Sequence, residues 1–226
     1  MNLYARRIKT LEKKIRGKIR GKIRGKTLRV MVVTKDQPVS TLAQLLTIPE
    51  VRDIGERTWQ EFERSFLDSD LYNKFRVKKV CFHFIGHLQS NKVRKVVEYF
   101  DMIQSVDSQE LFEKIHATAK SMGKVQEVLL ELNVSGDKKK YGLSCDSATD
   151  ILSTSKNFAH AHIAGVMTIL DASLSPSQKK KYFSQVSEFA KAHNLQIISM
   201  GMSDDYEYAV ECGSTMIRIG HAIFDS

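Results

Sequence analysis

The sequence predicts a single (β/α)8 barrel, and two observations lead to that fold class. Short apolar runs rich in β-branched residues alternate with segments of helical periodicity over about 200 residues. The first run is not followed by the glycine-rich turn that marks a dinucleotide-binding open sheet. A barrel of parallel strands is therefore favoured over the alternative, a doubly wound open sheet.

Each predicted strand is an apolar run bounded by polar or turn-forming residues. The first run reads LRVMVVTK and ends on Lys35. The fifth run has an apolar centre at residues 128–130 and carries Asn133 near its end. In chain order, the predicted strands are residues 28–35, 51–55, 80–86, 102–106, 125–134, 160–170, 196–200 and 215–220.

The segments between these strands carry helix signals. Ser108 and Ser203 are predicted as N-caps, and Pro176 suits the first turn of a long helix. The predicted helices are residues 39–46, 57–66, 90–99, 108–122, 146–155, 176–193 and 203–212. Residues 221–226 are too few for a complete eighth helix, so we expect an N-terminal helix, residues 2–13, to cover that part of the barrel.

Positive charge is concentrated in an N-terminal arm. Residues 1–29 contain 12 of the 35 Lys and Arg residues and one of the 26 Asp and Glu residues, so the net charge of +9 belongs to this arm. The tetrapeptide Lys-Ile-Arg-Gly occurs three times, at residues 14–25. Its isoleucine spacing favours a helix, but each glycine opposes one by about 1 kcal/mol. We expect a marginal helix or a mobile segment there, and divide the chain into an arm, 1–27, and a barrel domain, 28–226.

Composition narrows the compartment and the class of protein. A hydrophobic content of 42% with 27% charged residues fits a globular protein. No apolar stretch approaches the roughly 20 residues of a membrane helix, and no signal-peptide pattern is present. The odd, widely spaced Cys81, Cys145 and Cys212 suit a reducing compartment better than a disulfide framework or a zinc site. We expect a cytoplasmic protein without a metal site.

Lys35 is the first candidate for chemistry, because functional groups of a barrel lie where strands end and βα loops begin. Apolar surroundings disfavour a charged ammonium, and the neutral amine forms a Schiff base with an aldehyde. The alternative for this residue alone is a lysine that ends a strand and extends into water.

The segments after the seventh and eighth strands are a frequent phosphate site in such barrels. They contribute hydroxyl groups, glycines that let backbone N–H groups approach, and a guanidinium group. These residues are Ser199, Gly201, Ser203, Arg218 and Gly220. Together with Lys35 across the barrel mouth, they predict a ligand with both an aldehyde and a phosphate, such as pyridoxal phosphate.

Four segments carry a resemblance to a known family: VVTK at 32–35, HFIGHLQSNK at 83–92, SMGMSDD at 199–205 and GSTMIRIG at 213–220. With them, the chain from about residue 28 to its end resembles the YggS/PROSC family of pyridoxal phosphate homeostasis proteins, which have the alanine racemase N-terminal barrel. The resemblance implies a protein that carries or buffers pyridoxal 5'-phosphate through a Lys35 Schiff base, in vitamin B6 homeostasis, with little or no catalysis.

The resemblance also implies roles for individual residues. Lys35 would form the Schiff base, and Asn133 and the strand end at 83–86 would lie near the cofactor ring. The phosphate side would be lined by Ser199, Met200, Gly201, Arg218 and Gly220. Two residues depart from the family pattern: Arg57 stands where asparagine is usual, and His221 replaces a small hydroxyl residue. We expect cofactor binding to survive both changes.

Two other functions stay open at this stage. A racemase-like pyridoxal phosphate enzyme needs proton donors on both faces of the substrate, and in racemases of this fold the second comes from an extra β domain that this chain is too short to hold. A binder of nucleic acid or other anions would depend on the N-terminal arm alone. The expected partners are pyridoxal phosphate and apo forms of enzymes that use it, with no membrane, and the resemblance implies a monomer or weak dimer.

Overall fold

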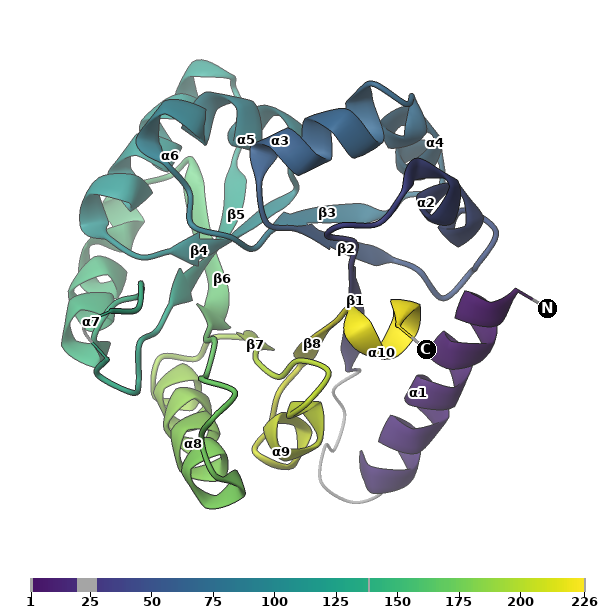
Figure 1. Ribbon diagram of the computed structural model, residues 1–226. Helices are drawn as coiled ribbons and strands as arrows, with labels where there is room; N and C mark the ends of the chain where they lie inside the picture. The colour runs from purple at the N-terminus through teal and green to yellow at the C-terminus, as the bar shows by residue number, and fades with distance from the viewer. Residues whose placement is uncertain (1, 20–27, 138, 226) are drawn as a thin grey trace.

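A computed structural model describes residues 2–19, 28–137 and 139–225, and in these residues parallel strands close into a barrel surrounded by helices (Figure 1). Neighbouring strands follow chain order, and β8 returns to pair with β1, which closes the barrel. The strands are β1 (Arg29–Val33), β2 (Asp53–Glu56), β3 (Cys81–Phe84), β4 (Met102–Val106), β5 (Gln126–Glu131), β6 (Ala161–Met167), β7 (Ile197–Ser199) and β8 (Met216–Ile219). This confirms the predicted fold class.

Helices precede β1, occupy the connections between strands and follow β8. They are α1 (Leu3–Ile19), α2 (Val39–Leu45), α3 (Trp59–Phe62), α4 (Leu71–Val77), α5 (Val93–Tyr99), α6 (Gln109–Ser121), α7 (Cys145–Thr154), α8 (Pro176–Ala192), α9 (Tyr206–Glu211) and α10 (His221–Phe224). A π-helical turn, Glu63–Leu67, extends α3, and 3-10 turns, Ser90–Lys92 and Ser155–Asn157, flank α5 and α7. Ser108 caps α6 by accepting a hydrogen bond from the Leu111 N–H, and Pro176 begins α8, as predicted.

Two elements differ from the sequence prediction. Helix α4 was not predicted, because its buried face consists of only Leu71 and Phe75 in a short, mostly polar segment. The predicted helix at 203–212 begins instead at Tyr206, so Ser203 is not its N-cap. The Ser203 hydroxyl accepts a hydrogen bond from the Ala222 N–H at 3.2 Å, which ties the loop after β7 to α10.

The N-terminal helix packs beside the C-terminal one, where the sequence left a gap in the helical ring (Figure 1). The rings of Tyr4 and Phe224 lie 5.5 Å apart, and Arg7 Nη1 donates to the Ile223 carbonyl at 2.9 Å. The helix runs further than the predicted 2–13, through the first Lys-Ile-Arg-Gly repeat, because Ile15 is buried. The last two repeats fall largely on residues 20–27, which lie outside the described residues, so the boundary at residue 27 stays a prediction.

The core has two parts, one on each side of the barrel wall. A large apolar cluster fills the space between strands and helices, including Ile8 and Leu11 of α1. Inside the barrel are two smaller clusters rich in methionine: Met31, Val33, Ile85 and Met216, and Met102, Leu129 and Met167. The barrel interior is therefore filled rather than open, as expected for eight strands.

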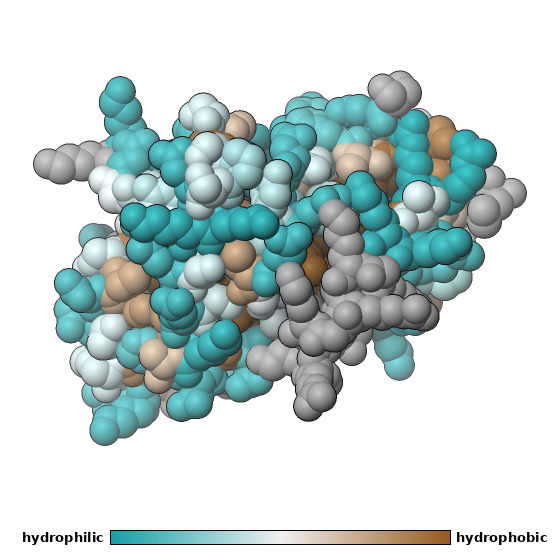
Figure 2. Space-filling view, turned by 90° about the horizontal axis from the view of Figure 1, so that it is seen from below, coloured by the Kyte–Doolittle hydropathy of each residue, from teal (hydrophilic) through white to brown (hydrophobic). Residues whose placement is uncertain are grey.

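The surface seen in Figure 2 is mainly hydrophilic, and its apolar side chains appear in small separate areas. Large apolar side chains that are exposed lie far apart in the sequence: Leu3, Val39, Val77, Val125, Tyr141 and Ile169. Among the described helices, none combines the length and apolar character needed to cross a bilayer.

The packing of α1 predicts a stability effect. Ile8 is 1% exposed, so Ile8→Ala should lower the free energy of unfolding by about 2–4 kcal/mol, through lost apolar burial and a cavity. Urea denaturation measures this value. Thr10→Ala on the exposed side of the same helix is the matched control and should change it by less than about 0.5 kcal/mol. A similarly small effect of Ile8→Ala would show that α1 does not belong to the folded core.

Candidate functional site

A cavity of about 320 Å³ opens at the barrel end where the strands terminate. Loops after β1, β2, β3, β6 and β7 meet there with the end of β8. Its polar lining consists of Lys35, Arg57, Ser203, Asp204, Arg218, Gly220 and His221, and its apolar lining of Val33, Ile85, Ile169 and Met202. Two arginines and one lysine thus face this cavity together with one carboxylate, so basic groups outnumber acidic ones among its described lining residues and favour an anionic ligand.

Lys35 reaches this cavity from a turn rather than from the strand itself. Strand β1 ends at Val33, and the following Asp36 adopts a left-handed conformation with φ of 60°. The Lys35 side chain is half-buried. Within the described part of the chain its amine makes no hydrogen bond or ion pair, so the amine is available to a ligand in the cavity.

Arg218 lies on the inner side of β8 and is 3% exposed. Its Nη1 donates to the carbonyl and hydroxyl oxygens of Ser199 at 2.8 and 2.9 Å, and Nη2 donates to the Thr168 carbonyl at 2.8 Å. Burial lowers the pKa of Arg218 to about 10, and the nearby Glu131 carboxylate opposes that shift. The guanidinium group therefore remains charged at neutral pH and is held at a fixed place in the cavity wall.

Three residues predicted for the phosphate side lie behind the cavity wall. Ser199 and Met200 are fully buried, with the Ser199 hydroxyl bonded to Arg218 and Met200 packed in the outer core. Gly201 has φ of 97°, and a Cβ there would lie 2.6 Å from that of Ala209, so only glycine suits this position. Their roles in binding stay a prediction. The loop beyond them, Met202 to Asp204, lines the cavity and was signalled by the same SMGMSDD segment.

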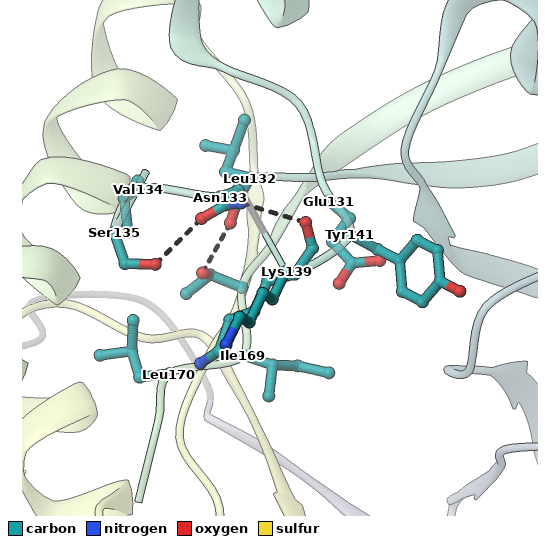
Figure 3. A pocket seen from close by; sticks show the side chains of 11 residues that line it. Glu131, Leu132, Asn133, Val134, Ser135, Lys139, Tyr141, Ile169 and Leu170 are labelled. Carbon is teal, nitrogen blue, oxygen red and sulfur yellow. Dashed lines mark hydrogen bonds between the residues drawn. The ribbon is translucent and has the colours of Figure 1, made fainter. Parts of the chain in front are cut away.

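Asn133 lines a second cavity of about 230 Å³, which shares Ile169 with the first (Figure 3). Its Nδ2 donates to the carbonyls of Asp137 and Lys140 at 2.8 and 3.2 Å, and its Oδ1 accepts from the Ser135 hydroxyl at 3.0 Å. The structure therefore gives the Asn133 side chain a role in shaping the loop after β5. Its predicted position beside a cofactor ring stays a prediction.

The strand end at 83–86 divides between two environments. Ile85 lines the first cavity, whereas His83 is 1% exposed and points into the barrel interior, where its Nε2 lies 2.9 Å from Asp53 Oδ1.

The two departures from the family pattern, Arg57 and His221, both line the first cavity. Arg57 also lines a neighbouring cavity of about 250 Å³ together with His87 and Lys92, so it separates the two hollows.

Two buried carboxyl groups lie at strand ends near the mouth. Glu56, at the end of β2, accepts a hydrogen bond from the Thr34 hydroxyl through Oε1, and burial raises its pKa to about 8. Its Oε2 is buried without a hydrogen-bond partner among the described residues. Glu131, at the end of β5, has a pKa raised to about 7, mainly by burial. The sequence places Glu56 at the end of the second strand but gives no signal of its burial, and Glu131 was not among the sequence candidates.

Comparisons with known proteins agree with this architecture. The model of the alanine racemase N-terminal domain family matches residues 11–226. A pyridoxal phosphate homeostasis protein of Synechocystis is 33% identical over 204 residues, covering 88% of this chain and 91% of that protein. Its counterpart in Pasteurella multocida is 29% identical over 206 residues, covering 87% and 85%. The structure of PipY of Synechococcus elongatus with pyridoxal phosphate bound has a TM-score of 0.82 at 27% identity, covering 98% of this chain and 99% of that one.

The fold and the site together define an alanine racemase-type barrel, with a lysine and an arginine that reach one cavity from the first and last strands. Within that class, the chain belongs to the pyridoxal phosphate homeostasis protein family. This confirms the family resemblance of the VVTK, HFIGHLQSNK, SMGMSDD and GSTMIRIG segments.

The raised pKa of Glu56 predicts that stability falls as pH rises. The folded state favours the protonated carboxyl, so its contribution is fully present below the ordinary pKa of 4.5 and is lost as pH approaches about 8. Between pH 5 and 8, the free energy of unfolding should decline by up to about 1.4 kcal/mol per pH unit. Glu131 contributes to the same decline up to pH of about 7.

Urea denaturation at several pH values measures this slope. Glu56→Gln keeps a neutral group at all pH values and should reduce the slope, whereas Glu98→Gln at an exposed position of α5 should leave it unchanged. A slope in Glu56→Gln equal to that of the unmodified protein would exclude Glu56 as the titrating group.

Proposed function

We propose that this chain binds pyridoxal 5'-phosphate in the cavity at the barrel mouth and holds the cofactor covalently at Lys35. One observation carries the proposal: Lys35, Ser203, Arg218 and Gly220 all line the same cavity although they come from opposite ends of the chain. The relatives named pyridoxal phosphate homeostasis proteins support it, as does the PipY structure with that cofactor bound.

The residues at the mouth fit each chemical part of this cofactor. The cofactor supplies an aldehyde, which condenses with a primary amine and releases water. Lys35 offers such an amine without a competing partner among the described residues. Arg218 offers a fixed cation and Arg57 an exposed one. Gly220 brings its backbone within reach of the anion because it carries no side chain.

We place the protein among carriers that buffer the free cofactor, and propose that apo forms of pyridoxal phosphate enzymes receive it. The cavity lies at the barrel rim, and Lys35 is only half-buried, so a bound cofactor stays near solvent. A monomer or weak dimer leaves this mouth accessible. A cytoplasmic location fits the proposal, because the free cofactor and its enzymes are found there.

Lys35→Ala should abolish covalent capture of the cofactor. The protein is incubated with pyridoxal phosphate, reduced with sodium borohydride and digested, and mass spectrometry locates the pyridoxyl group. We expect the label on the peptide that contains Lys35 and its loss in the variant. Lys74→Ala, at an exposed position of α4, is the matched control and should keep it. Undiminished labelling of the Lys35→Ala protein would refute Lys35 as the attachment site.

A carrier should show little chemistry toward amino acids. Exchange of the α-hydrogen requires an acid–base group placed at the reacting carbon, and racemisation requires one on each face. We expect the loaded protein to exchange the α-hydrogen of L-alanine in deuterated buffer no faster than free pyridoxal phosphate at equal concentration, as measured by proton NMR. Exchange more than about tenfold faster than that reference would favour the racemase-like alternative.

A further inference from the structure

A continuous path of hydrogen bonds crosses the barrel interior from the cavity to the opposite end. It begins at Arg218, whose Nη1 donates to the Ser199 hydroxyl at 2.9 Å, and that hydroxyl lies 2.7 Å from Gln104 Oε1. On the other side of the Gln104 amide, Nε2 lies 3.1 Å from His83 Nδ1. The four side chains come from β8, β7, β4 and β3, so the path is built by the barrel and not by neighbours in sequence.

The path continues beyond His83 to the end of the barrel where the strands begin. His83 Nε2 lies 2.9 Å from Asp53 Oδ1, and Asp53 accepts hydrogen bonds from Nε and Nη2 of Arg29. Burial by itself raises the pKa of Asp53, but the hydrogen bonds from His83 and Arg29 outweigh it and hold that pKa below its ordinary value. Asp53 is therefore a carboxylate, which accepts hydrogen bonds and donates none.

Donors and acceptors follow one another along the path in a consistent direction. Because a guanidinium group only donates, Ser199 accepts from Arg218, and its own proton goes to Gln104 Oε1. The Gln104 amide presents its N–H to His83 Nδ1, 3.1 Å away. On the other side of the ring, Nε2 is directed at the Asp53 carboxylate, which can only accept a hydrogen bond.

Polar groups are costly at these positions, because His83, Gln104 and Ser199 are each no more than 1% exposed. Met102 and Met216 contact the same Gln104 amide, so apolar side chains of similar size occupy the neighbouring positions. Filling the barrel interior therefore does not by itself require a polar side chain at Gln104. The hydrogen bonds of this buried path instead fix the place of Arg218 at the cavity wall.

We propose that His83 and Gln104 are positioning residues, which act through Ser199 to hold the Arg218 guanidinium in place toward a ligand in the cavity. Arg218 also donates to two backbone carbonyls, so loss of the path should loosen one guanidinium nitrogen rather than release the whole group. The inference rests on the proposed function, since the ligand meant here is pyridoxal phosphate.

Gln104→Met tests the path, because it removes both hydrogen bonds and nearly keeps the side-chain volume. We expect about tenfold weaker binding of pyridoxal phosphate, followed by absorbance, since one fixed contact of a charged group becomes loose. The pH midpoint of the bound cofactor's absorbance should shift as well. Ser105→Ala, the next residue on β4, is the matched control: its buried hydroxyl has no partner among the described residues, and neither quantity should change.

Substitution of His83 separates positioning from simple packing. Gln at this position offers one acceptor and one donor, so His83→Gln should keep affinity within about threefold, whereas His83→Leu should match Gln104→Met. Urea denaturation without the cofactor gives each variant's stability. Variants that are less stable but bind with unchanged affinity and absorbance midpoint would overturn the proposal. They would show that the path contributes to folding stability and not to binding.

The histidine tautomer provides a test that does not involve the cofactor. Nitrogen-15 NMR of histidine-labelled protein should show a proton on His83 Nε2, which the Asp53 carboxylate accepts, and a ring without a proton on Nε2 would overturn the proposal. Failure of the unmodified protein to bind pyridoxal phosphate would instead refute the proposed function, with the tautomer result unaffected. The two failures are therefore distinguishable.

Discussion

Pairing of β8 with β1 is the contact on which the rest of the structure depends. Lys35 follows the first strand and Arg218 lies in the last, so only this pairing brings them to one cavity. In its register, Met31 lies beside Arg218 and Val32 beside Ile219. This places Arg218 inside the wall, below the rim that Lys35 reaches. Parallel strands end at the same rim, so the loops that follow them share one solvent-facing site.

The interior of the barrel limits where a ligand fits. Eight strands enclose a space that side chains alone fill, and here methionines share it with polar groups. At Gly165, a Cβ would lie 1.9 Å from the Ile197 carbonyl oxygen, which shows how closely adjacent strands approach there. The cavities that contain Lys35 and Asn133 accordingly lie among the loops beyond the strand ends. The interior orients groups for that site and does not itself receive a ligand.

Strand order and the residues at strand ends could be predicted from the sequence, because apolar runs and the polar residues that end them are local signals. Lys35 and Arg218 are strand-end residues that such local signals identify. The side of the barrel wall that a residue faces cannot be predicted from local sequence, because it depends on strand register. Register shifts occur in the pairing of β4 with β5 and in that of β5 with β6. Ser199 is predicted to line the phosphate side; its hydroxyl contacts Arg218, and its role in binding stays a prediction. Gln104 and Ser105 are adjacent polar residues of β4, and no local pattern distinguishes the one that belongs to the path from the one whose hydroxyl has no partner among the described residues.

The contact between α1 and α10 has a consequence for synthesis on the ribosome. The apolar stripe of α1, which includes Ile8 and Leu11, packs in the same core as Ile223 of α10. About 200 residues separate the two helices, so at ordinary elongation rates the ribosome synthesises α10 roughly 10–40 s after α1. During that interval the apolar side chains of this cationic segment lack the contacts that α10 provides in the folded protein.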